Sequence, residues 1–288
     1  MEYRRKTASR IYKHLEDRVN CTNILEYIRT HSSESKKLVI DDILVNLEII
    51  KYSDSTSDSD GSSASRNENG SLDLLLKKDL DKKYEIYDFI SEANHTGFEY
   101  FPYLYGVLDC HSELNSKVYV LYEMFDGTLD TLFSELEQGS DWYEIIFQVC
   151  LINHYMINIA KVSYSDAIVP HHFYQKYKFP KKREYTLGDY KFEMYHKNLI
   201  TLWDFKLEPE STHLPSNINH VLNYITSNTS KFKVQPSQRI IRMLSDITFD
   251  STNIPKILDS YYNTKKEIKQ ETKQETKQDT TDTLHEEQ

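Results

Sequence analysis

Apolar residues recur at helical spacing in three parts of the chain. Ile11, Leu15 and Val19 share one helical face, and the pattern continues to about residue 31, which predicts an N-terminal helix. Residues 140–162 give the clearest helix, with an apolar stripe formed by Ile145, Ile146, Val149, Ile152, Met156 and Ile159. Residues 217–263 alternate Asn- and Ser-rich turns with helical patterns, so we expect further helices there.

Runs of β-branched and aromatic residues predict strands between these helices. Residues 37–52 fit a strand or a short helix equally well, whereas residues 84–93 have helical spacing. Around Leu187-Gly188-Asp189 the pattern predicts two or three short strands joined by a turn. The runs that we expect to form strands are LDLLLKK at 72–78, YFPYLYGVLDC at 100–110, KVYVLYEM at 117–124 and parts of 182–205.

The order of these elements divides the chain into four parts of an α+β protein. We expect an N-terminal helical segment over 1–37, a β-rich lobe over 38–122, a helical lobe over 123–263 and a disordered charged tail over 264–288. Residues 53–71 are dominated by Ser, Asp, Asn and Gly, so we expect a disordered loop within the β-rich lobe. The loop suits a solvated linker or a phosphoacceptor segment for acid-directed kinases.

The net charge limits the partners that we expect. The chain has a formal charge of −10, which disfavours nucleic-acid binding because such binding needs clustered Lys and Arg. The basic opening, MEYRRKTASRIYKHLEDR, is a local exception that we interpret as the polar face of a helix. We therefore expect a protein substrate or a protein partner, and no nucleic acid.

Cysteine usage and hydropathy bear on the compartment. Cys21, Cys110 and Cys150 are far apart and in no metal-ligand spacing, so we expect no disulfides and a reducing environment. No apolar run approaches the roughly 18 residues of a membrane span, and no signal-peptide pattern follows the basic opening. The expected location is therefore the cytoplasm, which for a viral protein means the host cytoplasm or the virion, with no membrane partner.

The segment KVYVLYEMFDGTLDTLFSEL resembles the last N-lobe strand, the hinge and the first C-lobe helix of the protein-kinase-like family, in the divergent form encoded by large DNA viruses. The resemblance covers roughly residues 72–262. It implies a two-lobed fold with a reduced β-rich N-lobe and a small helical C-lobe. It also implies that the hinge backbone around Glu123, Met124 and Phe125 would hydrogen-bond the adenine of ATP.

Further segments extend this resemblance in the same order as in the family. YEIYDFISEA looks like the αC helix, which makes Glu85 the partner of an ATP-binding lysine at Lys77 or Lys78. YSDAIVPHHFY stands where the family has its catalytic loop, with Asp166 as the base, and LITLWDFKLE places Asp204 at the metal-holding position. The implied activity is phosphoryl transfer from ATP to protein Ser or Thr with Mg²⁺, a reaction that depends on positioning and charge neutralisation.

Some positions depart from the family's pattern and keep other hypotheses open. His171 stands where the family has a second metal-binding residue, and histidine is a poor ligand for Mg²⁺. Lys206 replaces the glycine that follows Phe205, and no G-x-G-x-x-G occurs. A catalytically inactive kinase-fold protein that binds or scaffolds a partner is therefore the alternative. A structural viral protein of unrelated fold is the third hypothesis. Asp204 also fits a plain strand-end residue, and we expect Trp203 and Phe205 to belong to the core.

Overall fold

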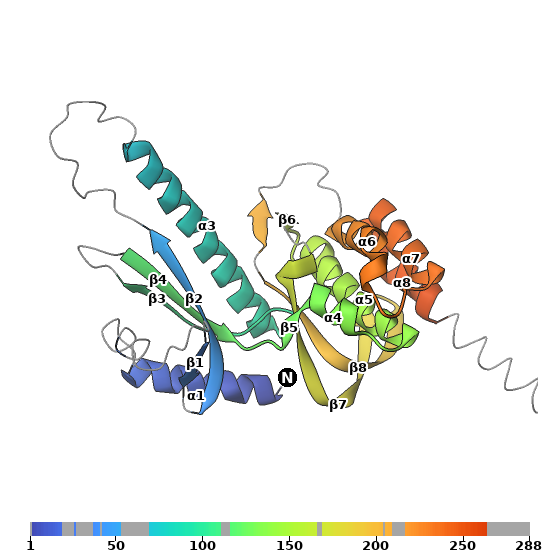
Figure 1. The fold of residues 1–288 in the computed structure, drawn as a ribbon, viewed down its shortest axis with the longest axis horizontal. Coiled ribbons are helices and arrows are strands. Elements are labelled where there is room, and N and C mark those ends of the chain that lie inside the picture. The colour runs from blue at the N-terminus through green and yellow to red at the C-terminus, as the bar shows by residue number, and fades with distance from the viewer. Residues whose placement is uncertain are drawn as a thin grey trace, which may run out of the picture.

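The computed structural model describes residues 2–18, 26, 37–40, 42–52, 69–110, 116–165, 169–203, 205–208 and 217–263. Within them the chain is a mixed α+β protein whose paired strands are all antiparallel (Figure 1). The predicted tail at 264–288 and most of the predicted Ser/Asp loop lie outside the described residues. Helix begins at Asn69, so the last three residues assigned to that loop are helical instead.

The first sheet contains four strands in the order β1-β2-β4-β3. They are β1 (Lys37–Ile40), β2 (Ile43–Tyr52), β3 (Leu104–Cys110) and β4 (Ser116–Glu123). Residues 37–52, which fitted a strand or a helix, thus form two strands. The strands predicted within 100–110 and 117–124 are confirmed as Leu104–Cys110 and Ser116–Glu123, and their side chains alternate between the two faces of the sheet.

Two helices cover opposite faces of this sheet. Helix α1 (Glu2–Arg18) packs Ala8 and Ile11 against a cluster that includes Tyr119 of β4, whereas helix α3 (Asn69–Thr96) packs Ile90 into the larger core that includes Val120. Figure 1 shows the sheet between the two helices. Adjacent residues of one strand contact different helices because strand side chains alternate, which gives the sheet a buried layer on each face.

The predicted strand LDLLLKK is wrong, because residues 72–78 belong to α3. This run has no β-branched residue, and Leu and Lys both favour helix. A short apolar run carries too little periodicity to separate a strand from a buried helix segment. Lys77 and Lys78 therefore lie on the same helix as Glu85, and not on a strand that faces it.

A short segment leads from β4 into the second half of the fold. The elements that follow this segment are β5 (Gly127–Thr128), α4 (Leu129–Glu135), α5 (Gly139–His154) and a π-helical turn at Tyr155–Ile159. A Cβ at Gly127 would lie 2.9 Å from a ring carbon of Tyr174, so glycine allows the close approach of β5 to the neighbouring strand. Helix α5 is buried along most of its length, as its apolar stripe predicted.

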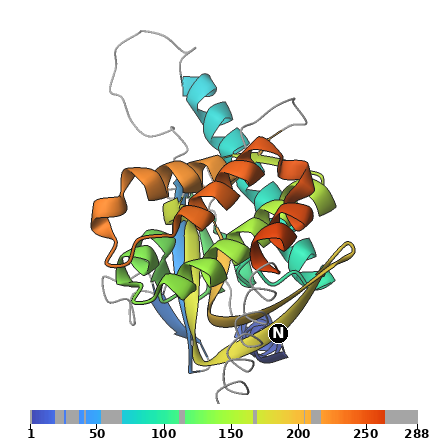
Figure 2. The same ribbon diagram turned by 90° about the vertical axis from the view of Figure 1, so that its right-hand side faces the viewer.

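The longest strands form a hairpin that packs against α5. They are β7 (His172–Leu187) and β8 (Tyr190–Leu202), joined by a two-residue turn in which Gly188 has a φ of +60°. The predicted turn is confirmed, although the strands are longer than expected. Between the pairs Lys176–Asn198 and Lys181–His196 the register shifts, so four residues of β7 face one residue of β8. Figure 2 shows the hairpin bending before it reaches its tip, as a bulge of this kind requires.

Shorter strands and three helices complete the described residues. Strand β6 (Ser163–Ser165) pairs with β9 (Lys206–Glu208), and 3₁₀ turns lie at Val169–His171, Thr229–Lys231 and Ser251–Asn253. The helices predicted within 217–263 are confirmed as α6 (Asn217–Ser227), α7 (Gln238–Phe249) and α8 (Ile254–Tyr262). The part assigned to a helical lobe thus holds the longest strands as well as helices. Across the described residues, no helix is both long and apolar enough to cross a membrane.

Candidate functional site

The end of β4 and the segment that follows it carry the residues expected to bind adenine. The Glu123 side chain is buried, and its carboxylate accepts hydrogen bonds from Nε of Arg4 at 2.8 Å and from Nη2 at 2.5 Å. The Arg4 guanidinium also donates to the carbonyls of Glu99 and Phe101, at 2.6 Å and 2.9 Å. Burial alone would lower the pKa of Arg4, but the pKa is raised because the Glu123 carboxylate stabilises the cation.

The backbone of the same segment is bonded largely within the protein. The Glu123 amide donates to the carbonyl of Tyr103 at 3.0 Å, and its carbonyl accepts from the Asn46 side chain at 2.8 Å. The carbonyl of Met124 accepts from the side-chain amide of Gln175 at 2.5 Å. Phe125 stacks on Phe173 of β7 with ring centroids 4.8 Å apart. Part of the hydrogen-bonding capacity expected for adenine is thus already used by protein groups.

Among the described side chains, one ion pair between the first sheet and α3 has the opposite polarity to the lysine–glutamate pair that the resemblance implied. Glu85 is exposed on α3. The strand-to-helix ion pair instead joins Glu48 of β2 to Lys83 of α3, with 2.9 Å between Oε1 and Nζ. The carboxylate lies on the strand and the ammonium on the helix, whereas the resemblance implied the reverse.

Asp166 and Asp204 both lie outside the described residues. The residues beside them are described, and they are in contact: Ser165 pairs with Lys206 in the β6–β9 ladder. The amide of Trp203 also donates to the carbonyl of His171 at 3.0 Å. The two segments that carry the aspartates are therefore joined at both ends by backbone contacts.

Aromatic side chains fill the region between α3, the first sheet and the end of β8. Trp203 is buried and stacks between Tyr87 of α3 and Tyr122 of β4, with centroid distances of 5.8 Å and 4.5 Å. Phe205 is buried against Phe101 at 5.7 Å. The prediction that Trp203 and Phe205 belong to the core is confirmed.

His171 ends the 3₁₀ turn that precedes β7 and is half-buried. Among the residues that the structure describes, no group of three or more His, Cys, Asp or Glu side chains could hold a metal ion. A metal-binding role for His171 therefore depends on Asp204 and stays a prediction. Cys150 is a free buried thiol, whereas Cys110 is disulfide-bonded, so the expectation of no disulfides is not confirmed. Cys21 lies outside the described residues.

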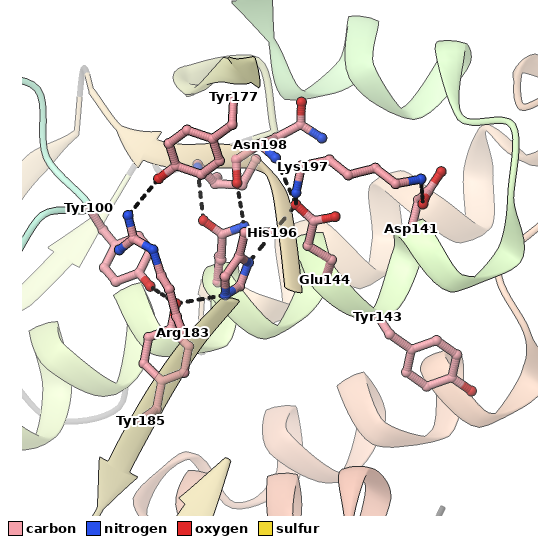
Figure 3. Close-up of polar contacts among 12 residues, drawn as sticks. Tyr100, Asp141, Tyr143, Glu144, Tyr177, Arg183, Tyr185, His196, Lys197 and Asn198 are labelled. Carbon is pink, nitrogen blue, oxygen red and sulfur yellow. Dashed lines mark hydrogen bonds and ion pairs between the residues drawn. The ribbon is translucent and has the colours of Figure 1, made fainter. Parts of the chain in front are cut away.

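A second polar cluster lies where α5 packs on β8 (Figure 3). One oxygen of Glu144 accepts hydrogen bonds from the amides of Lys197 and Asn198, at 2.5 Å and 2.8 Å. One helical turn later, Gln148 donates to the Asn198 carbonyl and accepts from the Ile200 amide, both at 3.0 Å. These two side chains satisfy four backbone groups along the edge of β8, which would otherwise be buried without partners.

The cluster continues through His196 toward the first sheet. The Nε2 of His196 is 2.7 Å from the Tyr185 hydroxyl, which accepts a bond from the Tyr100 hydroxyl at 2.8 Å. Burial lowers the pKa of His196 to about 4, and burial raises the pKa of Glu144 to about 7. Although His196 Nδ1 lies 3.9 Å from Glu144, a histidine of that pKa is neutral at pH 7, so this contact is not an ion pair there.

A pocket of about 440 Å³ opens on the other side of Tyr185. Its lining is mostly apolar and includes part of the π-helical turn. Arg183 lies in this wall, forms an ion pair with Glu99 and donates to the Tyr177 hydroxyl at 2.7 Å. The lining residues are Gly97, Phe98, Glu99, Tyr100, Leu151, His154, Tyr155, Ile159, Arg183, Glu184, Tyr185 and Leu187.

Sequence reasoning missed these two clusters for different reasons. Glu144 and Gln148 stand four positions apart inside an otherwise apolar stretch, EIIFQVC, and that spacing was a usable signal for polar groups facing one partner. Arg4 lies in the basic opening that we interpreted as a solvated helix face, and no local pattern marks it as the partner of Glu123.

The comparisons with known proteins give a relative and no assigned activity. No protein-family model matches the chain. An uncharacterized protein, R691 of Acanthamoeba polyphaga mimivirus, is 39% identical over 284 residues, which covers 90% of this chain and 98% of that protein. Mimivirus is a large DNA virus, which agrees with the viral part of the resemblance described above. The chain belongs to the same family as mimivirus R691.

Proposed function

We propose that this chain is a kinase-like protein that binds a protein partner and does not transfer phosphate. The order of elements supports a kinase-like arrangement: helix α3 precedes β3, β4 leads through a short link into α4, and the long helix α5 precedes the segment that holds residue 166. The first sheet and the helices of the second half occupy opposite ends of the molecule (Figure 1).

The observation that carries the loss of phosphoryl transfer is the reversed Glu48–Lys83 pair. An ATP-binding site needs a cation on the sheet to hold the phosphates, and here β2 presents the Glu48 carboxylate toward α3. A carboxylate at this place repels phosphate oxygens instead of neutralising them. The described residues therefore do not fit Mg-ATP as the resemblance implied.

The link after β4 supports the same proposal. The Gln175 amide occupies the Met124 carbonyl, and the Glu123 backbone is bonded on both sides. An adenine would have to displace these protein hydrogen bonds to form its own, so the number of hydrogen bonds would not increase. The exchange leaves little net binding energy.

Retained phosphoryl transfer is the second candidate, and one observation favours it. The contacts of Ser165 with Lys206 and of His171 with Trp203 join the two segments that carry Asp166 and Asp204. A metal-assisted transfer would require both aspartates at one site, and these contacts between the neighbouring residues favour this candidate.

Thermal melts of the full chain with and without Mg-ATP separate the two candidates. A nucleotide that binds only the folded state at a hundredfold excess over Kd stabilises it by about 2.7 kcal/mol, which is a rise of roughly 5–11 °C in Tm for a domain of this size. The proposal expects no rise, in the wild type or in Asp204→Asn. Incorporation of labelled phosphate into a mixed Ser/Thr protein substrate should be equal in both proteins.

The opposite result is equally clear. A rise that needs both Mg²⁺ and ATP, and that Asp204→Asn abolishes, contradicts the proposal and establishes the second candidate. Asp189→Asn is the matched control, because Asp189 is exposed in the turn between β7 and β8. It should behave as the wild type in either case.

A further inference from the structure

The bend of the β7–β8 hairpin presents a run of exposed side chains outside the sites described so far. Residues 177–180 face Lys197 alone across the ladder, so β7 bulges outward at this point. The five residues 178–182 that form and follow the bulge are all exposed. Because residues 177–180 lack one-to-one ladder partners on β8, the strand bends here, and residues 178–182 are not covered by the other described residues.

The charge of the hairpin is opposite to that of the whole chain. Residues 172–202 contain seven Lys or Arg and three Asp or Glu, in a chain whose formal charge is −10. Lys178 and Lys181 have no acidic partner among the described residues. Lys178 lies over the ring of Phe179 at 5.8 Å, and Lys181 lies over the ring of Tyr177 at 4.2 Å. The two ammonium groups are thus held beside aromatic rings and left available for an acid.

Two aromatic side chains accompany these lysines at the surface. Phe179 is 71% exposed and Tyr195 is 61% exposed. Tyr195 pairs directly with Lys182 in the ladder, so the two side chains lie on the same face of the hairpin. Lys182 forms an ion pair with Glu193, whereas Lys178 beside Phe179 does not have such a partner among the described residues. Exposed aromatic rings beside lysines are typical of contact surfaces, because such rings are otherwise among the groups most favoured in the interior.

We propose that this bend, residues 176–182 with Tyr195, is a docking surface for an acidic segment of a protein partner. The lysines would bind carboxylates or phosphoserines of that segment, and Phe179 would pack on one of its apolar side chains. The carboxylates of Glu135, Glu184 and Glu193 border the bend and interrupt its positive charge. They favour a short acidic peptide over a nucleic-acid backbone, which needs an uninterrupted basic track.

This surface names a partner class for the proposed binding function, yet it does not depend on the nucleotide question. The bend lies on the hairpin, while Glu48 and Lys83 join β2 to α3. The experiment with Mg-ATP and the experiment with an acidic peptide therefore test different sites, and one proposal can be contradicted while the other stands.

Fluorescence anisotropy with the full chain tests the proposal. The probe is a labelled peptide of about 12 residues, Asp and Glu throughout with a central Leu, and its counterpart with Asn and Gln is the neutral control. The acidic peptide should bind and weaken as salt is raised, and the neutral one should not bind. Lys178→Glu combined with Lys181→Glu should weaken binding by at least about tenfold at low salt, and Phe179→Ser by roughly threefold to tenfold.

Matched controls separate this surface from general charge and apolarity. Lys256→Glu changes an exposed lysine of α8, and Phe249→Ser changes a phenylalanine of α7 that is 95% exposed. Both should bind the acidic peptide within about twofold of the wild type. Thermal melts check that every variant is folded.

Three outcomes would overturn the proposal. In the first, the acidic peptide does not bind the wild type. In the second, the hairpin variants bind the acidic peptide as tightly as the control variants do. In the third, an oligouridylate of the same length binds more tightly than the peptide and loses its binding in the same hairpin variants, which assigns the surface to nucleic acid.

Discussion

Two buried polar clusters in this molecule hold their ionisable groups in different ways. Arg4 and Glu123 are 8% and 6% exposed, and Glu144 and His196 are 4% and 1% exposed, so burial is comparable. The Arg4 guanidinium meets a carboxylate and two carbonyls. The Glu144 carboxylate meets two amides, and His196 meets a hydroxyl.

The difference shows that the partner, and not the depth, decides the charge of a buried group. Where an opposite charge is within bonding distance, the pair stays ionised, as for Arg4. Where the partners are neutral dipoles, burial shifts the pKa until the neutral form prevails, as for His196. Removing one partner of the Arg4–Glu123 cluster should therefore destabilise the fold, and the stability that the Glu144–His196 cluster provides should depend on pH.

The largest effect should follow from Arg4→Met. The substitution keeps most of the apolar stem but leaves the Glu123 carboxylate buried without its cation, so we expect a loss of roughly 3–5 kcal/mol in the free energy of unfolding. Urea denaturation at pH 7 measures it. A loss below about 1 kcal/mol would contradict the assignment of a buried ionised pair.

The double variant Arg4→Met with Glu123→Gln sharpens this test. Because both charges are then absent, we expect the double variant to be more stable than Arg4→Met alone. The coupling from the double-mutant cycle should exceed about 1 kcal/mol.

The second cluster should give opposed pH effects. The pKa of Glu144 is raised from 4.5 to about 7, so its stabilisation is complete below pH 4.5 and is lost as pH rises to 7. The pKa of His196 is lowered from 6.5 to about 4, so its stabilisation is complete above pH 6.5 and is lost as pH falls to 4. Between pH 4.5 and 6.5 the two slopes nearly cancel in the wild type.

Single variants should reveal each slope. In Glu144→Gln, stability relative to the wild type should rise between pH 4.5 and 7, because the falling contribution of Glu144 is gone. In His196→Gln, stability relative to the wild type should fall as pH rises from 4 to 6.5, because the growing contribution of His196 is gone. Each change should reach at most about 3 kcal/mol, from 1.36 kcal/mol per pKa unit, and urea midpoints across pH 4–8 measure it. Parallel curves for all three proteins would show that the cluster does not titrate in this way.

The smallest effect should come from the half-buried Glu48–Lys83 pair. Its side chains are 25% and 38% exposed, so solvent screens the attraction. Glu48→Lys should cost about 0.5–1 kcal/mol, and adding Lys83→Glu should restore most of that loss because the pair is re-formed with exchanged charges. Thermal melts in low and high salt measure the difference, and a loss of several kcal/mol would place this pair with Arg4 instead.

Local patterns predicted the parts of the fold that local physics determines. The turn at Leu187-Gly188-Asp189 was predictable because glycine adopts the positive φ of such turns without steric cost, as Gly188 does. The apolar stripe along α5 predicted that helix. LDLLLKK misled because four apolar positions fit either period, and the helix continued beyond them. Residues 37–52 fit either period, and they form strands because β1 pairs with β2 and β2 pairs with β4.

The candidate site was less predictable because its contacts join distant segments. The sequence placed Glu123, Met124 and Phe125 where a strand ends, as found, but it did not indicate the Arg4 and Gln175 groups that bond these residues. The polarity of the strand-to-helix ion pair also depends on which residues of β2 and α3 meet, which only the packing defines. Asp166 and Asp204 keep their predicted roles as hypotheses.

The bond between Arg4 and Glu123 spans 119 residues of sequence, which has a consequence for synthesis on the ribosome. Helix α1 emerges before β4, which completes the surface that α1 packs against and follows only after that whole interval. At about 5–20 residues per second, the apolar face of α1 waits roughly 6 to 24 s for its partner. During that interval the nascent chain presents an amphipathic helix without a core, which is the kind of segment that chaperones bind.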